Sequence, residues 1–151
     1  MTRIAHFLIA AAFTAIAANA QTSVRPTPGG SRLFFIDGND LRPSPGGTRL
    51  LRVDGPNIRD ATGKRVLFLD GSAVRTEPSG PRIAFWDGKT LRRRPGGEIL
   101  VVVDGPDIRN TAGGKRLLFL DGPAPSAEQV TMLLYQWNAN LFRIPSTSAS
   151  R

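Results

Sequence analysis

Residues 81–122 read PRIAFWDGKTLRRRPGGEILVVVDGPDIRNTAGGKRLLFLDG and contain one phrase three times. Each copy has an apolar run, an Asp-Gly pair, two turn residues, and then an aliphatic residue that is usually followed by Arg. Three further copies occupy residues 32–71. Equivalent residues recur after 50 positions, which indicates that a block of three units was duplicated. The six Asp-Gly pairs lie 16 or 17 residues apart and begin at Asp37, Asp54, Asp70, Asp87, Asp104 and Asp121.

Each unit predicts a β-hairpin. In the second unit, residues 50–54 form the first strand, residues 55–58 the turn, and Arg59 begins the return strand. If Pro56 and Asn57 are the central turn residues, Asp54 lies opposite Arg59. The same register predicts five cross-strand ion pairs, each worth about 0.2–1 kcal/mol. These pairs are Asp37–Arg42, Asp54–Arg59, Asp70–Arg75, Asp87–Arg92 and Asp104–Arg109, whereas the sixth unit has Ser126 at the matching position.

The two strands of a unit differ in character. The first strands, such as residues 100–103 (LVVV), are apolar without alternation, which is typical of strands covered on both faces. The return strands are short, charged and often followed by Pro, like protected edge strands. We therefore expect an all-β fold of six tandem two-stranded hairpins with buried inner and exposed outer strands. A propeller-like array, a trefoil-like barrel and a larger ring closed by a homodimer all remain open.

The N-terminal residues of the chain suggest export. Residues 1–20 combine a basic start, an apolar core and an A-x-A site ending at Ala20, as in a cleaved signal peptide. Export to the periplasm or outside the cell, with Gln21 as the mature N-terminus, follows from this pattern. Residues 21–31 are rich in Pro, Gly, Ser and Thr and predict a flexible leader to the repeat domain at 32–122. A helical segment at 123–145 and a disordered tail at 146–151 complete the expected organisation.

The segment after the repeats predicts one amphipathic helix over residues 127–142. Ser126 and Gln129 form a capping box at its start. Val130, Leu133, Leu134, Trp137 and Leu141 fall on one face at steps of three and four. This face either closes the open end of the hairpin array as a lid, or leaves Leu134, Trp137 and Leu141 as a surface for a partner.

The chain offers little for catalysis. Its only histidine is His6, within the predicted signal peptide, and it has no cysteine. Imidazole- and thiolate-based catalysis, and zinc or copper sites built on those ligands, are therefore excluded after residue 20. Most of the acidic residues belong to the repeat, where turn chemistry accounts for them better than a calcium site does. We expect no enzyme, no cofactor and no metal.

The charge is strongly basic, with 20 Lys and Arg against 12 Asp and Glu. The densest cluster, Arg92, Arg93 and Arg94, is a candidate patch for anionic lipid, lipopolysaccharide or acidic glycan. Nucleic acid is disfavoured by the expected compartment. As an alternative to ligand binding, the basic side chains simply keep the exposed strands soluble.

The segments GKRVLFLDG (63–71) and GGKRLLFLDG (113–122) resemble the PD40 repeat of TolB-type periplasmic β-propellers, and PGGTRLL (45–51) is similar to that family's turn-and-strand opening. The resemblance covers residues 32–122. It implies a scaffold for protein contacts in the cell envelope and carries over no functional residue. The expected function is thus a non-catalytic exported scaffold that binds an envelope protein, with anionic-ligand binding through Arg92–Arg94 as the alternative.

Overall fold

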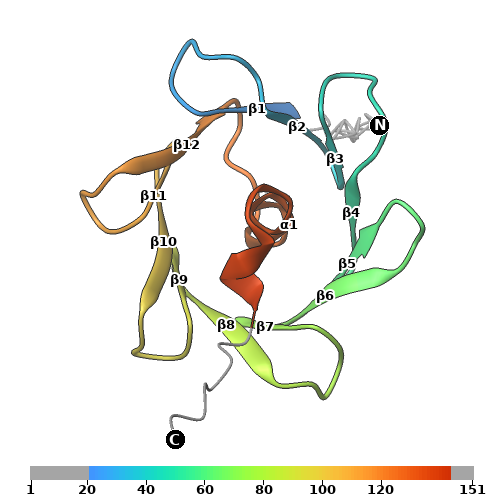
Figure 1. Cartoon of the computed structure of the whole chain (residues 1–151), viewed down its shortest axis with the longest axis vertical. Coiled ribbons are helices and arrows are strands. Elements are labelled where there is room, and N and C mark those ends of the chain that lie inside the picture. The colour runs from blue at the N-terminus through green and yellow to red at the C-terminus, as the bar shows by residue number, and fades with distance from the viewer. Residues whose placement is uncertain (1–20, 144–151) are drawn as a thin grey trace, which may run out of the picture.

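The computed structural model describes residues 21–143, which form a closed antiparallel barrel of twelve strands around one C-terminal helix, α1 (Figure 1). The signal peptide predicted for residues 1–20 and the tail predicted for 146–151 lie outside the described residues. The strands are β1 (Gln21–Arg25), β2 (Phe34–Asp37), β3 (Asp40–Arg42), β4 (Leu51–Asp54), β5 (Asn57–Asp60), β6 (Arg65–Asp70), β7 (Ala73–Arg75), β8 (Arg82–Asp87), β9 (Thr90–Arg92), β10 (Ile99–Asp104), β11 (Asp107–Arg109) and β12 (Arg116–Asp121).

Every strand from β2 to β12 pairs with its neighbours in sequence, and β1 pairs with both β2 and β12 to close the barrel. Asp-Gly starts the tight turn in the first five units, but the predicted turn is displaced by one residue, so the predicted cross-strand partners are wrong by two residues. Asp54 lies opposite Asn57, so Gly55 and Pro56 are the two loop residues. Gly55 has φ +58°, as the first position of a type II′ hairpin turn requires. Since this turn matches the right-handed twist of the strands, it replaces the predicted Pro-Asn turn.

The segment predicted as a flexible leader contains β1, which is a correction to the expected organisation. Ser23, Val24 and Arg25 pair with Asp121, Leu120 and Phe119 of β12. This register equals that of the other units, where for example Leu41 pairs with Ile36 and Arg42 with Phe35. β1 therefore pairs with β12 in the register in which β3 pairs with β2. The expected match at Ser126 is wrong because the matching strand comes from the other end of the chain.

The return strands are not exposed edges, which corrects the predicted division into inner and outer strands. Each is hydrogen-bonded on both sides in the barrel wall. One side chain of each return strand faces the interior and is fully buried, and these residues are Val24, Leu41, Ile58, Val74, Leu91 and Ile108. Closure removes edges altogether, so both strands of a unit have one interior and one exterior face.

In four of the first strands, an arginine covers the outward-facing phenylalanine. The guanidinium carbon of Arg32 lies 5.6 Å from the ring centre of Phe35. Arg82 lies over Phe85 in the same way at 5.7 Å. Arg65 over Phe68 and Arg116 over Phe119 repeat the arrangement, at 5.9 Å each. The apolar run is therefore covered by the core on one side and by cations on the other.

Helix α1 (Ala127–Trp137) lies inside the ring of strands (Figure 1). Its residues from Val130 to Leu134 are all buried. Five consecutive residues span more than one helical turn, so the helix is covered on every side. Their side chains join the strand residues in one hydrophobic core. The predicted lid is therefore a plug that fills the barrel.

Polar contacts fix the helix at its start. The predicted capping box is present, with Gln129 N donating to Ser126 Oγ at 3.2 Å and Ser126 N donating to Gln129 Oε1 at 2.7 Å. Gln129 Nε2 also donates to the carbonyl of Gly38 in the β2–β3 turn, at 2.6 Å. On the buried side, Trp86 Nε1 donates to Thr131 Oγ1 at 2.9 Å. These bonds set the depth to which the helix enters.

The helical segment is shorter than predicted. α1 ends at Trp137, and a separate 3₁₀ turn, η1 (Ala139–Phe142), follows. Asn138 has a non-helical backbone, with φ -154° and ψ 87°, and its side-chain oxygen accepts a hydrogen bond from Asn140 N at 3.2 Å. Asparagine side chains compete with helical hydrogen bonding in this way. Neither helix within residues 21–143 is long and apolar enough to cross a membrane.

Candidate functional site

The outward-facing arginine of each return strand holds the aspartate that precedes the tight turn. The Nε–Oδ2 distances are 3.2 Å for Arg25–Asp121, 4.0 Å for Arg42–Asp37, 2.9 Å for Arg59–Asp54, 3.5 Å for Arg75–Asp70, 3.4 Å for Arg92–Asp87 and 3.3 Å for Arg109–Asp104. The partners are diagonal rather than directly opposite, because Asp54 pairs in the ladder with Asn57 and Arg59 with Arg52. The long arginine side chain covers this offset. The sixth pair, Arg25–Asp121, joins residues 96 apart.

The same six arginines also bind the loops between units. Each donates Nη1 to a glycine carbonyl at the end of the following loop, as Arg92 does to Gly97 and Arg109 to Gly114. The other acceptors are Gly30, Gly47, Gly63 and Gly80. One guanidinium therefore ties the tight turn at one end of the strand to the loop at the other. These side chains have a structural role in every unit.

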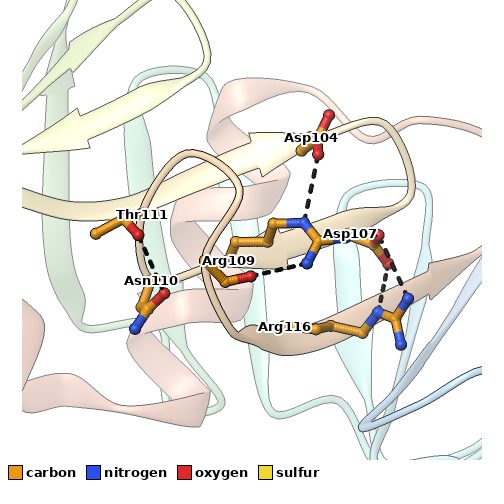
Figure 2. A network of polar contacts seen from close by, with 7 residues as sticks. Asp104, Asp107, Arg109, Asn110, Thr111 and Arg116 are labelled. Carbon is orange, nitrogen blue, oxygen red and sulfur yellow. Dashed lines mark hydrogen bonds and ion pairs between the residues drawn. The ribbon is translucent and has the colours of Figure 1, made fainter.

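A second set of arginines links adjacent units, and Asp107 is the centre of the best-connected example (Figure 2). Its carboxylate accepts from Arg116 Nε at 2.6 Å and from Arg109 Nη2 at 2.8 Å. Its side chain is only 12% exposed. The hydrogen bond and charge of Arg116, with a smaller contribution from Arg109, hold the pKa of Asp107 below its ordinary value despite burial. In other units Ser23 and Asn57 accept the equivalent bond from Arg32 and Arg65.

The predicted cluster Arg92, Arg93 and Arg94 is not a patch of three free cations. Arg92 is held by Asp87 and Gly97. Arg93 Nη1 donates to the carbonyls of Leu141 at 2.8 Å and Arg143 at 3.1 Å, and thereby fixes the segment after α1 to the wall. Arg94 is exposed. The sequence brings the three together, but the structure uses two of them internally.

The predicted partner surface on the helix is also mostly covered. Leu134 is fully buried in the barrel core. Trp137 and Leu141 are half-buried and pack against that core. Leu134, Trp137 and Leu141 therefore pack within the fold.

The described part of the chain contains a polar and an apolar cavity. The first, about 270 Å³, is a polar cleft on the outer wall that is lined by Arg49, Arg52, Asp54, Arg59, Asp60 and Gly63. The second, about 240 Å³, is an apolar pocket at the barrel mouth beside the start of α1 and includes Trp86, Val103, Pro125 and Val130 in its lining. The helix packs against β4, so the opposite wall at β10, with its small Val103, is less completely filled.

The polar cleft was not found from the sequence, although a signal for it exists. Residue 52 is Arg where units one, three, four and six have Phe at the matching position and unit five has Val102. The closing strand β1 also left a signal, because VRPTPGG (24–30) matches LRPSPGG (41–47). The leader thus contains the second half of a unit.

Within residues 21–143, no group of three or more histidine, cysteine, aspartate or glutamate side chains could hold a metal ion.

Searches with protein-family models, with curated proteins and with solved structures find no match to this chain. The resemblance to the PD40 repeat therefore stays a prediction, and the function is inferred from the structure.

Proposed function

We propose that this chain is a non-catalytic exported protein, a β-repeat scaffold whose outer wall binds a protein partner in the cell envelope. The observation that supports it best is the filled interior: α1 occupies the barrel, so contacts with another molecule fall to the wall and its loops. That wall presents arginines and partly buried phenylalanines, such as Arg82 over Phe85. Arginine and aromatic residues are enriched at protein interfaces.

Three further features support parts of this proposal. Strand β1 begins at Gln21, directly after the predicted cleavage site, so the proposed mature chain retains all twelve strands. Eight of the nine aspartates are in ion pairs, and Asp60 is held by its own turn, which favours structural over catalytic roles. We also propose that the barrel consists of six repeat units, the last of which is formed by β12 and β1.

The localisation is tested by mass spectrometry of the protein recovered from the periplasm and medium of expressing cells. We expect a chain that begins at Gln21. An N-terminus at Met1 or Thr2 in the recovered protein would contradict export with cleavage.

The scaffold function is tested by cross-linking in intact cells followed by purification of the protein. We expect a stoichiometric complex with one envelope protein that is lost when Arg82 and Phe85 are replaced by Ala, and kept when the exposed Lys115 is replaced instead. Recovery of only the free monomer, or of a homodimer, contradicts a scaffold for another protein.

A second candidate is binding of anionic lipid, lipopolysaccharide or acidic glycan, which the excess of Lys and Arg favours. We place this binding site in the arginine-lined cleft and not at Arg92–Arg94, because Arg92 and Arg93 bind other groups of the chain. Under this candidate, binding to acidic vesicles or polysaccharides falls steeply with salt. Binding that is indifferent to salt contradicts it.

A further inference from the structure

The Arg–Phe pattern of the outer wall is broken in units two and five, but unit five has the apolar Ile99 and Val102 at these positions, and only unit two has charged residues at both. In units one, three, four and six, the residue five positions before the aspartate is Arg and the residue two before it is Phe, and the two stack, as in Arg82 over Phe85. In unit two these positions hold Arg49 and Arg52. No ring is present there to support or cover Arg49. A site for one ligand requires such asymmetry, because six equal units would offer six equal sites.

The break opens the polar cleft of about 270 Å³. Arg59 is fixed in it by Asp54 at 2.9 Å and by the carbonyl of Gly63 at 3.1 Å. Arg52 Nε lies 3.9 Å from Asp40 Oδ1 and its side chain is 52% exposed. Arg49 has no ion pair or hydrogen bond from its side chain among the described residues. Two guanidinium groups are thus largely free to bind a ligand.

Carboxylates line the same cleft. Asp54 offers a side chain that is 60% exposed. Asp60 Oδ1 accepts from Thr62 Oγ1 at 2.6 Å and from Lys64 N at 3.0 Å. The hydrogen bond from the Thr62 side chain, with those from the backbone, holds the pKa of Asp60 below its ordinary value, so this group stays ionised. Three guanidinium groups and two carboxylates leave the lining with one net positive charge.

We propose that this cleft binds a single uronic acid unit, free or within an acidic polysaccharide. A carboxylate on the sugar pairs with Arg49 and Arg52, in the bidentate geometry that arginine favours. Asp54 and the second oxygen of Asp60 accept hydrogen bonds from the ring hydroxyls. The single net positive charge suits a monoanion with hydroxyl groups better than a phosphate dianion, which the two carboxylates repel. A volume below the usual range of about 300–1,000 Å³ for ligand pockets suits one ring.

This inference rests on the second candidate function and gives it a site and a ligand class. The test is titration of the folded protein with glucuronate at low salt, followed by NMR or calorimetry, with glucose and inorganic phosphate as comparison probes. Arg52→Phe restores the pattern of the other units, so it should close the cleft and let Arg49 stack on the new ring. Arg49→Gln removes the free guanidinium. Arg82→Gln is the matched control, because Arg82 has in unit four the position that Arg49 has in unit two.

We expect glucuronate to bind with a stoichiometry of one, and glucose and phosphate to bind at least about tenfold more weakly. Arg52→Phe and Arg49→Gln should each weaken glucuronate binding at least about tenfold. Arg82→Gln should leave it within about twofold, since Arg82 does not line the cleft. Circular dichroism tests whether each variant is folded. Arg52→Phe in particular copies a residue that four units already accommodate.

The outcomes separate the site from the broader function. Equal binding of phosphate, or equal losses in all three variants, overturns the uronate site. If acidic polysaccharide binds in a salt-dependent way while Arg52→Phe and Arg49→Gln bind as the wild type does, the cleft inference fails and the anion-binding candidate stands. If neither glucuronate nor polyuronate binds, both fail.

Discussion

A single arginine organises each unit at the residue scale. Arg92, for example, joins Asp87 before the turn to the carbonyl of Gly97 after the next loop, and Phe85 lies opposite it in the ladder. The paired aspartates are mostly exposed, so each ion pair contributes little to stability. Their value lies in orientation, because two contacts from one planar group fix the loop relative to the strand.

Asp107 is the exception, and its burial gives a prediction about acid stability. Its pKa is lower in the folded protein than in the unfolded chain, so its contribution is fully present above the unfolded value of about 3.9 and is lost as the pH falls through the folded value. Asp107→Asn should therefore lower stability at neutral pH and reduce the loss of stability below about pH 4. Urea denaturation from pH 7 to pH 2 measures this. The exposed Asp121→Asn is the control, and an unchanged pH profile for Asp107→Asn contradicts the prediction.

At the element scale, β1 and α1 are the two pieces without which the other strands cannot form the observed barrel. β1 supplies hydrogen bonds to both β2 and β12. α1 supplies apolar side chains to the whole interior. Without β1 the barrel has two open edges, and without α1 its walls face a void.

For β1, we expect Val24→Ala to cost more than Arg25→Ala. Val24 is fully buried, and burying a valine side chain is worth about 1.5–3 kcal/mol. Arg25 pairs with an aspartate whose side chain is 56% exposed, so its loss should cost about 1 kcal/mol or less. Thermal and urea denaturation of both variants measure the difference. A chain that starts at Pro26 should aggregate or unfold, and a stable monomer from that chain would show that β1 is dispensable.

For α1, we expect Leu133→Ala to cost about 2–5 kcal/mol, the usual range for a buried leucine. Leu133 is fully buried within the barrel. The control is Gln136→Ala on the exposed part of the helix, with an expected change within about 0.5 kcal/mol. Truncation after Gly122 should unfold the protein. A truncated form that is monomeric and equally stable would contradict the role of the helix as a plug.

At the scale of the whole molecule, the strands and the helix form one core without a separable part. Trp86 illustrates this, because it belongs to the wall, packs in the core and donates its indole hydrogen to Thr131 of α1. The two chain ends meet the barrel at different places, through β1 in the wall and through Arg93, which holds the segment after the helix. The wall cannot close correctly unless both ends are in place.

This arrangement predicts a single cooperative unfolding transition. Tryptophan fluorescence, which reports on Trp86 beside α1 and on Trp137 at the end of α1, should change at the same urea concentration as the β-strand signal in circular dichroism. The two curves should superimpose within error in the wild type. A fluorescence change that precedes loss of the strand signal would show that the helix leaves a barrel that is stable alone.

The sequence by itself determined the local features: the Asp-Gly turns, the strands beside them, the capping box of α1 and the arginine partners five residues or fewer away. These depend on backbone preferences and on side chains that are close in the chain, so a short segment encodes them. The position of the turn was missed by one residue, and the cross-strand partners by two, because both Gly-Pro and Pro-Asn satisfy a two-residue turn and only the twist of the sheet favours the former.

Only the tertiary structure decided how the units close, where the helix lies and which arginines are free. The pairing of Arg25 with Asp121 spans 96 residues, and no local preference specifies it. Closure depends on the number and tilt of the strands and on a filled interior, and all of these are properties of the assembled barrel. The same assembly buries Leu134 in the core and engages Arg93 with the carbonyl of Leu141, contacts between segments that are far apart in the sequence, and it leaves the half-buried Arg49 and the exposed Arg52 lining a cleft.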